Sequence, residues 1–232
     1  MKEKEKELGA VKDNRGARHK FLAGSLCLDF TNTVHHHGFP DEVDDLRDHC
    51  DLVSWGQQSG VLDKDEATAL IRRASRYPVV AKKALHRAKA LRDLLRRIFA
   101  AVATGNPAKE AEVDALNEFV GRAMTFYRVV PGPEGFEWGW VDESDSLERV
   151  LWPVIESAAD LLVGGQLERV RECSLEGCTA LFQDTSKNNR RRWCDMTDCG
   201  NLVKSRRHYG RSRSIRRPLT VSLRKGIGLA KR

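Results

Sequence analysis

The chain has 232 residues, of which 41% are hydrophobic, so a buried core is available for one large or two modest domains. No run approaches the ~18 apolar residues of a membrane span, and no secretory signal follows the Lys/Glu-rich start, so we expect a soluble, cytoplasmic protein. The net charge of +7 is uneven: residues 171–232 carry 16 Lys/Arg against 5 Asp/Glu, whereas residues 1–170 are net acidic. A basic end on an acidic body indicates a nucleic-acid partner or another anionic surface.

Residues 1–20 are polar and predict a disordered lead-in. The apolar run over 21–34 then favours a helix that begins near Gly24–Ser25. Asp29 and Asn32 are polar residues inside this run. Either they belong to a hydrogen-bonded structural network, or they line the pocket of a sensor domain.

Three consecutive histidines, His35, His36 and His37, invite a metal-site interpretation. Neighbouring side chains diverge by about 100° in a helix or 180° in a strand, so the three cannot face one metal, and we predict a polar helix end. Cys27 and Cys50 lie apart from the other cysteines and are predicted to be small buried residues.

Helical periodicity dominates the middle of the chain. Asp63 with Glu66 three residues later is typical of a capping box at a helix start. Apolar residues at three- to four-residue spacing predict a helix over about 80–103. Gly105-Asn106-Pro107 should end it and begin the next one, with Pro107 in the first turn. A further helix is predicted over about 145–163.

Aromatic and β-branched runs at Phe126–Val130 and Phe136–Val141 flank a Pro/Gly-rich turn and predict a hairpin. Core packing is the default expectation for four tryptophans, and a pocket lining is the alternative. These are Trp55, Trp138, Trp140 and Trp152.

Four cysteines, Cys173, Cys178, Cys194 and Cys199, form two pairs with four intervening residues each. This spacing predicts one structural Zn²⁺ held by four thiolates, in preference to two disulfides or four free thiols. Four protein ligands leave no open position for a catalytic water, and no enzyme motif is present elsewhere. We therefore expect no enzymatic activity.

Between the cysteine pairs, a strand over 180–183, a turn over 184–189 and a return strand over 190–194 are expected, followed by a helix to about residue 213. This is the order of a treble-clef finger. The predicted fold class is mainly α with a small β-hairpin: a helical N-terminal domain, 21–165, followed by a small α+β treble-clef-like zinc finger, 166–213. Residues 214–232 are predicted to form a basic, flexible tail.

The finger carries many cations, which we predict to contact nucleic-acid phosphates. The alternative is a solvated surface that only keeps the protein soluble. The candidate nucleic-acid-binding residues are Lys187, Arg190, Arg191, Arg192, Lys204, Arg206, Arg207 and Arg211.

The finger resembles the CGNR zinc-finger family, and the N-terminal run resembles the opening of that family's helical ABATE domain. The finger matches are Phe182, Asp184, Ser186, Asn188, Arg191, Arg192 and Trp193. The N-terminal matches are Phe21, Gly24, Leu26, Leu28, Asp29, Phe30, Asn32 and Thr33. The resemblance implies a stress-responsive transcription regulator with a DNA-binding finger and a ligand- or signal-sensing N-terminal domain. Leu202 departs from the family pattern, which has Arg at this position.

The sequence therefore predicts a DNA-binding transcription regulator with one structural zinc. The alternative function is an RNA-associated or protein-docking finger without sequence-specific DNA readout. DNA is the expected partner, a small-molecule ligand of the N-terminal domain and a homodimer are left open, and no membrane partner is expected.

Overall fold

A computed structural model describes residues 19–141 and 146–206. The chain divides into two compact units, Met1–Cys194 and Asp195–Arg232. Most of the predicted lead-in 1–20, the predicted tail 214–232, and the candidate contacts Arg207 and Arg211 lie outside the described residues.

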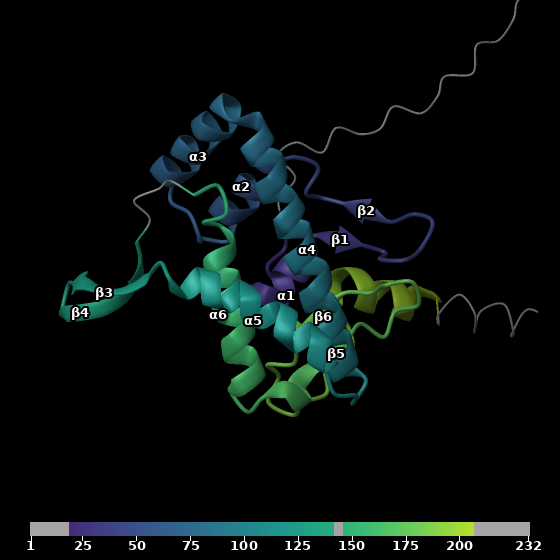
Figure 1. Cartoon of the computed structure of the whole chain (residues 1–232). Helices are drawn as coiled ribbons and strands as arrows, with labels where there is room; N and C mark the ends of the chain where they lie inside the picture. The colour runs from purple at the N-terminus through teal and green to yellow at the C-terminus, as the bar shows by residue number, and fades with distance from the viewer. Residues whose placement is uncertain (1–18, 142–145, 207–232) are drawn as a thin grey trace, which may run out of the picture. The chain divides into compact units, whose positions relative to one another are not determined.

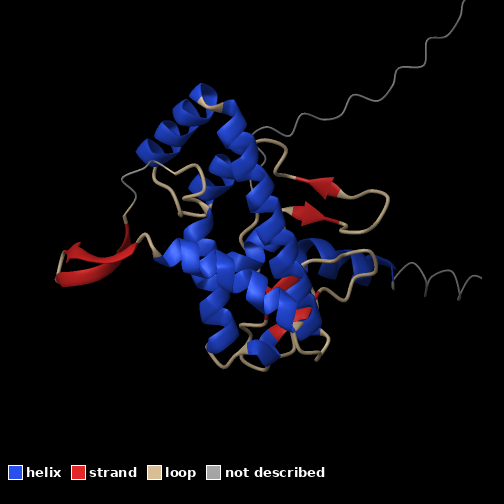
Figure 2. Cartoon of the chain, viewed as in Figure 1, coloured by secondary structure: helices blue, strands red, loops and turns tan. Residues whose placement is uncertain are grey.

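The first unit is mainly helical, with short hairpins only (Figures 1 and 2), which confirms the predicted fold class. Its helices are α1 (Leu26–Thr31), α2 (His49–Gln58), α3 (Lys64–Arg76), α4 (Pro78–Ala103), α5 (Glu110–Met124) and α6 (Leu151–Val163). Its strands are β1 (Val34–His35), β2 (Val43–Asp44), β3 (Tyr127–Gly132), β4 (Gly135–Trp140), β5 (Val170–Glu172) and β6 (Leu181–Gln183), with a 3₁₀ turn η1 at Leu167–Arg169. No helix of the described ranges is long and apolar enough to cross a membrane.

Local capping explains where several helices begin. Asp63 accepts hydrogen bonds from the backbone of Asp65 and Glu66, and Glu66 accepts one from the Asp63 N–H, which confirms the predicted capping box of α3. Pro107 is not in the first turn of α5, contrary to the prediction. That helix begins at Glu110, where acidic residues interact favourably with the helix dipole.

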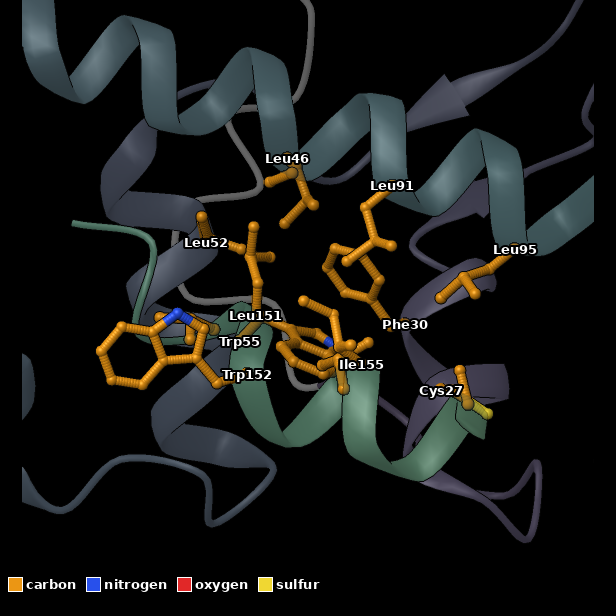
Figure 3. Close-up of a cluster of buried hydrophobic side chains, with 14 of the residues drawn as sticks. Cys27, Phe30, Leu46, Leu52, Trp55, Leu91, Leu95, Leu151, Trp152 and Ile155 are labelled. Atoms are coloured by element: carbon orange, nitrogen blue, oxygen red, sulfur yellow. The ribbon is translucent and has the colours of Figure 1, made fainter. Parts of the chain in front are cut away.

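The core lies among α1, α2, α4 and α6, whose buried side chains interdigitate in Figure 3. Phe30 of α1 meets Trp55 of α2 edge to face, with ring centroids 5.0 Å apart. Cys27 is fully buried there, as predicted. Cys50 is exposed, contrary to the prediction, because the buried face of α2 is formed by His49, Leu52 and Val53.

The three histidines lie at the end of β1 and in the turn that follows, so the predicted helix end is wrong. One ring nitrogen of each histidine faces a different carboxylate. His35 pairs with Asp45 at 2.8 Å, His36 with Asp41 at 2.5 Å, and His37 with Glu42 at 3.1 Å. A positive φ of 52° at His36 turns the chain after β1. The histidines therefore bind local acids in the β1–β2 loop.

The β3–β4 hairpin extends away from the helices in Figure 1. Its register pairs Tyr127 with Trp140, Val129 with Trp138, and Pro131 with Phe136, which gives one face six apolar or aromatic residues. Trp138 is 63% exposed, so its default core assignment is wrong, whereas Trp55 and Trp152 are buried as expected. Trp138 stacks locally on Tyr127 instead, with ring centroids 5.1 Å apart.

Candidate metal centre and nucleic-acid interface

The first cysteine pair forms the loop of a small hairpin. Cys173 follows β5 directly, and its backbone N–H donates to the Ala180 carbonyl at 2.9 Å, across the knuckle. The Cys178 N–H donates to Leu175 O at 2.9 Å, and Gly177 has φ 81°, a conformation that favours glycine.

Strand β6 then pairs with β5, from Val170↔Gln183 to Glu172↔Leu181.

This pairing corrects the predicted hairpin, in which residues 190–194 were the partner of 180–183. The carboxylate of the buried Asp184 accepts the N–H of Ser186 at 2.9 Å and the N–H of Arg191 at 2.7 Å. These bonds close residues 184–191 into a loop, and they give the Arg191 N–H a side-chain acceptor instead of a strand partner. Residues 190–194 consequently form no strand, although the Arg192 carbonyl accepts the Ser174 N–H at 2.8 Å.

Cys199 lies on a π-helical turn, η2 (Met196–Gly200), in the second unit. Asp195 caps this turn by accepting the Thr197 N–H at 2.7 Å, and a helical segment over 201–206 follows. A helix after the second cysteine pair agrees with the prediction as far as residue 206.

The cysteines fit a tetrahedral metal. The ligand atoms of Cys173, Cys178, Cys194 and Cys199 all lie within 4.8 Å of one another, and the sulfurs of Cys178 and Cys194 are 3.7 Å apart. A tetrahedral Zn²⁺ with bonds of about 2.3 Å requires sulfur–sulfur distances of about 3.8 Å. Across the described residues, this is the only such cluster of metal-ligating side chains. The four residues thus suit one structural Zn²⁺, as predicted.

The cysteine thiols hydrogen-bond one another, and these contacts shift their pKa values in opposite directions. Hydrogen bonds from the Cys178 and Cys194 thiols lower the pKa of Cys173. The contact with Cys173 raises the pKa of Cys178, against an opposing hydrogen bond with Cys194, and the contacts with Cys173 and Cys178 raise the pKa of Cys194; burial raises both. Adjacent thiolates repel, so a site that gathers them is suited to a cation that favours the ionised form of every ligand.

Strand β6 is joined to the helical domain by backbone recognition from α1. Asn32, the C-cap of α1, donates its Nδ2 to the Leu181 carbonyl at 2.8 Å and accepts the Leu181 N–H on Oδ1 at 2.9 Å. Two residues further along the same edge, the Gln183 N–H donates to the Ala23 carbonyl at 2.7 Å. Leu181 and Phe182 are both fully buried. The first half of the finger is therefore part of the same packed unit as the helices.

Two arginines fix the rest of this half. Arg96, which is buried on α4, donates to the Thr179 carbonyl at 2.7 Å. The Arg191 guanidinium lies over the Phe182 ring at 4.5 Å and donates to Leu22 O at 2.9 Å, to Trp193 O at 3.0 Å, and to Cys194 O. No sequence pattern around Arg96 indicates this contact, because Arg96 and Thr179 are 83 residues apart.

The other candidate cations are oriented differently. The loop between β6 and Cys194 exposes Lys187, Arg190 and Arg192. In the run of three arginines, only the middle one, Arg191, is partly buried. Lys204 and Arg206 are exposed on the helical segment of the second unit, where Leu202 is also 43% exposed. Arg191 differs from these residues because protein carbonyls already accept its N–H donors.

The two candidate pocket residues have backbone partners in the structure. Asn32 binds Leu181, and Asp29 accepts the Ala23 N–H at 2.9 Å. Burial raises the pKa of Asp29 to about 6, against the opposing effect of backbone hydrogen bonds from Ala23 and Leu22 and of the charge of Arg191. Both contacts lie next to the junction between α1 and the finger.

A helical domain packed against the Cys173–Cys178 knuckle of a four-cysteine cluster defines a zinc-finger protein. Residues 24–165 match the ABATE family, described as "putative stress-induced transcription regulator", and residues 169–212 match the CGNR zinc finger. The chain belongs to the ABATE family, as its resemblance implied. Neither family is an enzyme family, and no curated protein matches the chain.

Proposed function

We propose that the protein is a DNA-binding transcription regulator, in which zinc folds the finger and exposed Arg and Lys side chains contact DNA phosphates. The four-cysteine cluster supports this proposal most strongly, because it lies in the segment of the chain where Lys and Arg outnumber Asp and Glu. Metal ligation contributes on the order of 10 kcal/mol to folding in small fingers.

Among the candidate cations, the exposed side chains of Lys187, Arg190 and Arg192 are the proposed phosphate contacts of the first unit. Lys204 and Arg206 are the proposed contacts of the second unit, together with Arg207 and Arg211 beyond the described residues. We assign a supporting role to Arg191, because its guanidinium donates to the carbonyls of Leu22, Trp193 and Cys194. Phosphate contacts position the finger, and base contacts would supply sequence preference.

The helical domain is the proposed sensor. The residues that flank α1, Ala23 and Asn32, bind β6, so a change in α1 has a short route to the strand that precedes the Asp184 loop. A signal that alters α1 would alter the finger through these bonds. Asp29 and Asn32 would then act at the junction between the signal and the finger.

Selection of bound sequences from randomised duplex DNA, with zinc-loaded full-length protein near physiological salt, tests this function. We expect a shared motif that is preferred over random duplex by about 10³ or more. Recovery of unselected duplexes only, with an affinity that collapses as salt rises, would contradict sequence-specific regulation and favour the RNA-associated or protein-docking alternative.

Cys194→Ser tests the role of the metal. We expect zinc content to fall from about one per chain to near zero and DNA affinity to be lost, because three thiolates leave the tetrahedral site incomplete. Cys50→Ser is the matched control, since Cys50 is exposed and lies outside the cluster. If Cys194→Ser retained both zinc and DNA affinity, the proposed function would be wrong.

A further inference from the structure

An open surface cavity of about 480 Å³ is lined by the start of α1, by α6 and by β6. Its size is within the range of small-molecule sites. Its polar lining comes from three separate parts of the chain: Ser25, Glu156, Ser157, Asp160, Gln166 and Gln183. Apolar surface is supplied by Leu26, Pro153 and Leu161.

The electrostatics of the cavity favour a cation. Glu156 and Asp160 lie one turn apart on α6, and no Lys, Arg or His lines the cavity. Within the described ranges, neither carboxylate takes part in an ion pair. The cavity also borders the C-terminal end of α6, which carries a partial negative charge and has no basic residue in its last turn.

The geometry further distinguishes an organic cation from a metal ion. Glu156 accepts the Tyr127 hydroxyl on Oε1 at 2.5 Å, which leaves its other oxygen and the Asp160 carboxylate as acceptors. The described residues place no third carboxylate, histidine or cysteine with these two, and hard cations require more oxygen ligands than two carboxylates supply. Two acceptors one helical turn apart, beside apolar side chains, match the ends and the methylenes of a short aliphatic diamine.

The cavity also touches the finger. The Gln183 side chain donates to Gln166 Oε1 at 3.0 Å, and its backbone N–H donates to Ala23 O at 2.7 Å. Gly24, with φ 81°, lies so close to β6 that an added Cβ would be 3.2 Å from the Gln183 carbonyl. Ser25 and Ser157 bond each other at 3.0 Å, and Ser157 accepts the Cys27 N–H at 3.2 Å, which connects the cavity to α1.

We infer that this cavity binds an aliphatic diamine or polyamine through Glu156 and Asp160, and that an occupant acts on β6 through Gln166 and Gln183. This inference deepens the proposed function, because it names the chemical class of the signal, and its regulatory part rests on that function.

Isothermal titration of the zinc-loaded full chain with putrescine at low ionic strength tests the binding. We expect saturable one-to-one binding, weakened about tenfold or more in Asp160→Asn, since the variant loses a charge-assisted hydrogen bond. Asp114→Asn on α5, an exposed acid outside the cavity, is the matched control and should bind like the wild type. Circular dichroism establishes that both variants are folded.

Three results would overturn the binding site: no binding by the wild type, equal weakening in both variants, or displacement of putrescine by equimolar Mg²⁺ or Ca²⁺. A separate measurement compares DNA affinity with and without putrescine, using Asp160→Asn to subtract direct effects of the amine on DNA. Specific binding of putrescine without a change in DNA affinity would contradict its role as the signal. DNA binding without putrescine binding would refute the cavity and leave the proposed function intact.

Discussion

The β3–β4 and β5–β6 hairpins share an antiparallel pattern but lie in opposite surroundings. Each strand of β3–β4 has six residues, yet Phe136 is 81% exposed. Each strand of β5–β6 has only three residues, yet Leu181 and Phe182 are fully buried. The longer hairpin depends mainly on its own cross-strand pairs, with the Tyr127–Glu156 hydrogen bond as a contact to α6, whereas the shorter one depends on α1, α4 and the cysteine knuckle.

The largest expected difference between the two hairpins is in the loss of stability when one phenylalanine in each is truncated. Phe182→Ala should lower the unfolding free energy by about 3–5 kcal/mol, because it leaves a cavity in the core and removes the ring beneath Arg191. Phe136→Ala should change it by less than about 0.5 kcal/mol. Chemical denaturation of zinc-loaded protein measures both values. Similar losses for the two variants would show that the hairpins are not held differently.

The next largest effect concerns the Asn32 amide. Asn32→Ala should cost about 2–4 kcal/mol, because it leaves both the N–H and the carbonyl of the buried Leu181 without a side-chain partner. Asn117→Ala, at an exposed position of α5, is the control and should be near neutral. A cost for Asn32→Ala as small as that of the control would mean that α1 does not hold β6.

A smaller effect should appear as a pH dependence at Asp29. Its pKa rises from 3.8 to about 6 on folding, so the folded state favours the protonated carboxyl. The stability that Asp29 contributes is therefore fully present below pH 3.8 and is lost as pH rises through about 6. Allowing for partial exposure, Asp29→Asn should gain about 1 kcal/mol relative to the wild type between pH 5 and 7.5.

Denaturation at the two pH values measures this gain, and Asp114→Asn, at an exposed position of α5, is the control variant. A pH-independent difference between Asp29→Asn and the wild type would refute the raised pKa of Asp29.

Local patterns in the sequence predicted local structure well. The Asp63–Glu66 capping box, the Pro/Gly turn of β3–β4 and the helix over 78–103 each depend on residues close together in the chain. The spacing of the four cysteines likewise predicted the metal centre, since the ligand chemistry is explicit in the residue types.

The junction between the domain and the finger could not be predicted in this way. Asn32 and Leu181 are 149 residues apart, and an Asn within an apolar run specifies a hydrogen bond without specifying its partner. The strand partner of β6 was missed because the Asp184 carboxylate competes for the Arg191 N–H that a return strand would use. The exposure of Trp138 was missed because aromatic alternation is the same on a buried and on a solvent-facing hairpin.

Hydrogen exchange with and without a zinc chelator tests most directly the claim that the metal centre and the helical domain are joined through β6. We predict that zinc removal accelerates exchange at the Leu181 and Gln183 amides, and also in α1, since Asn32 and Ala23 bind β6. The amides of β3–β4 should be unaffected and serve as an internal reference. Acceleration confined to the residues between Cys173 and Cys199, with α1 unchanged, would contradict the claim.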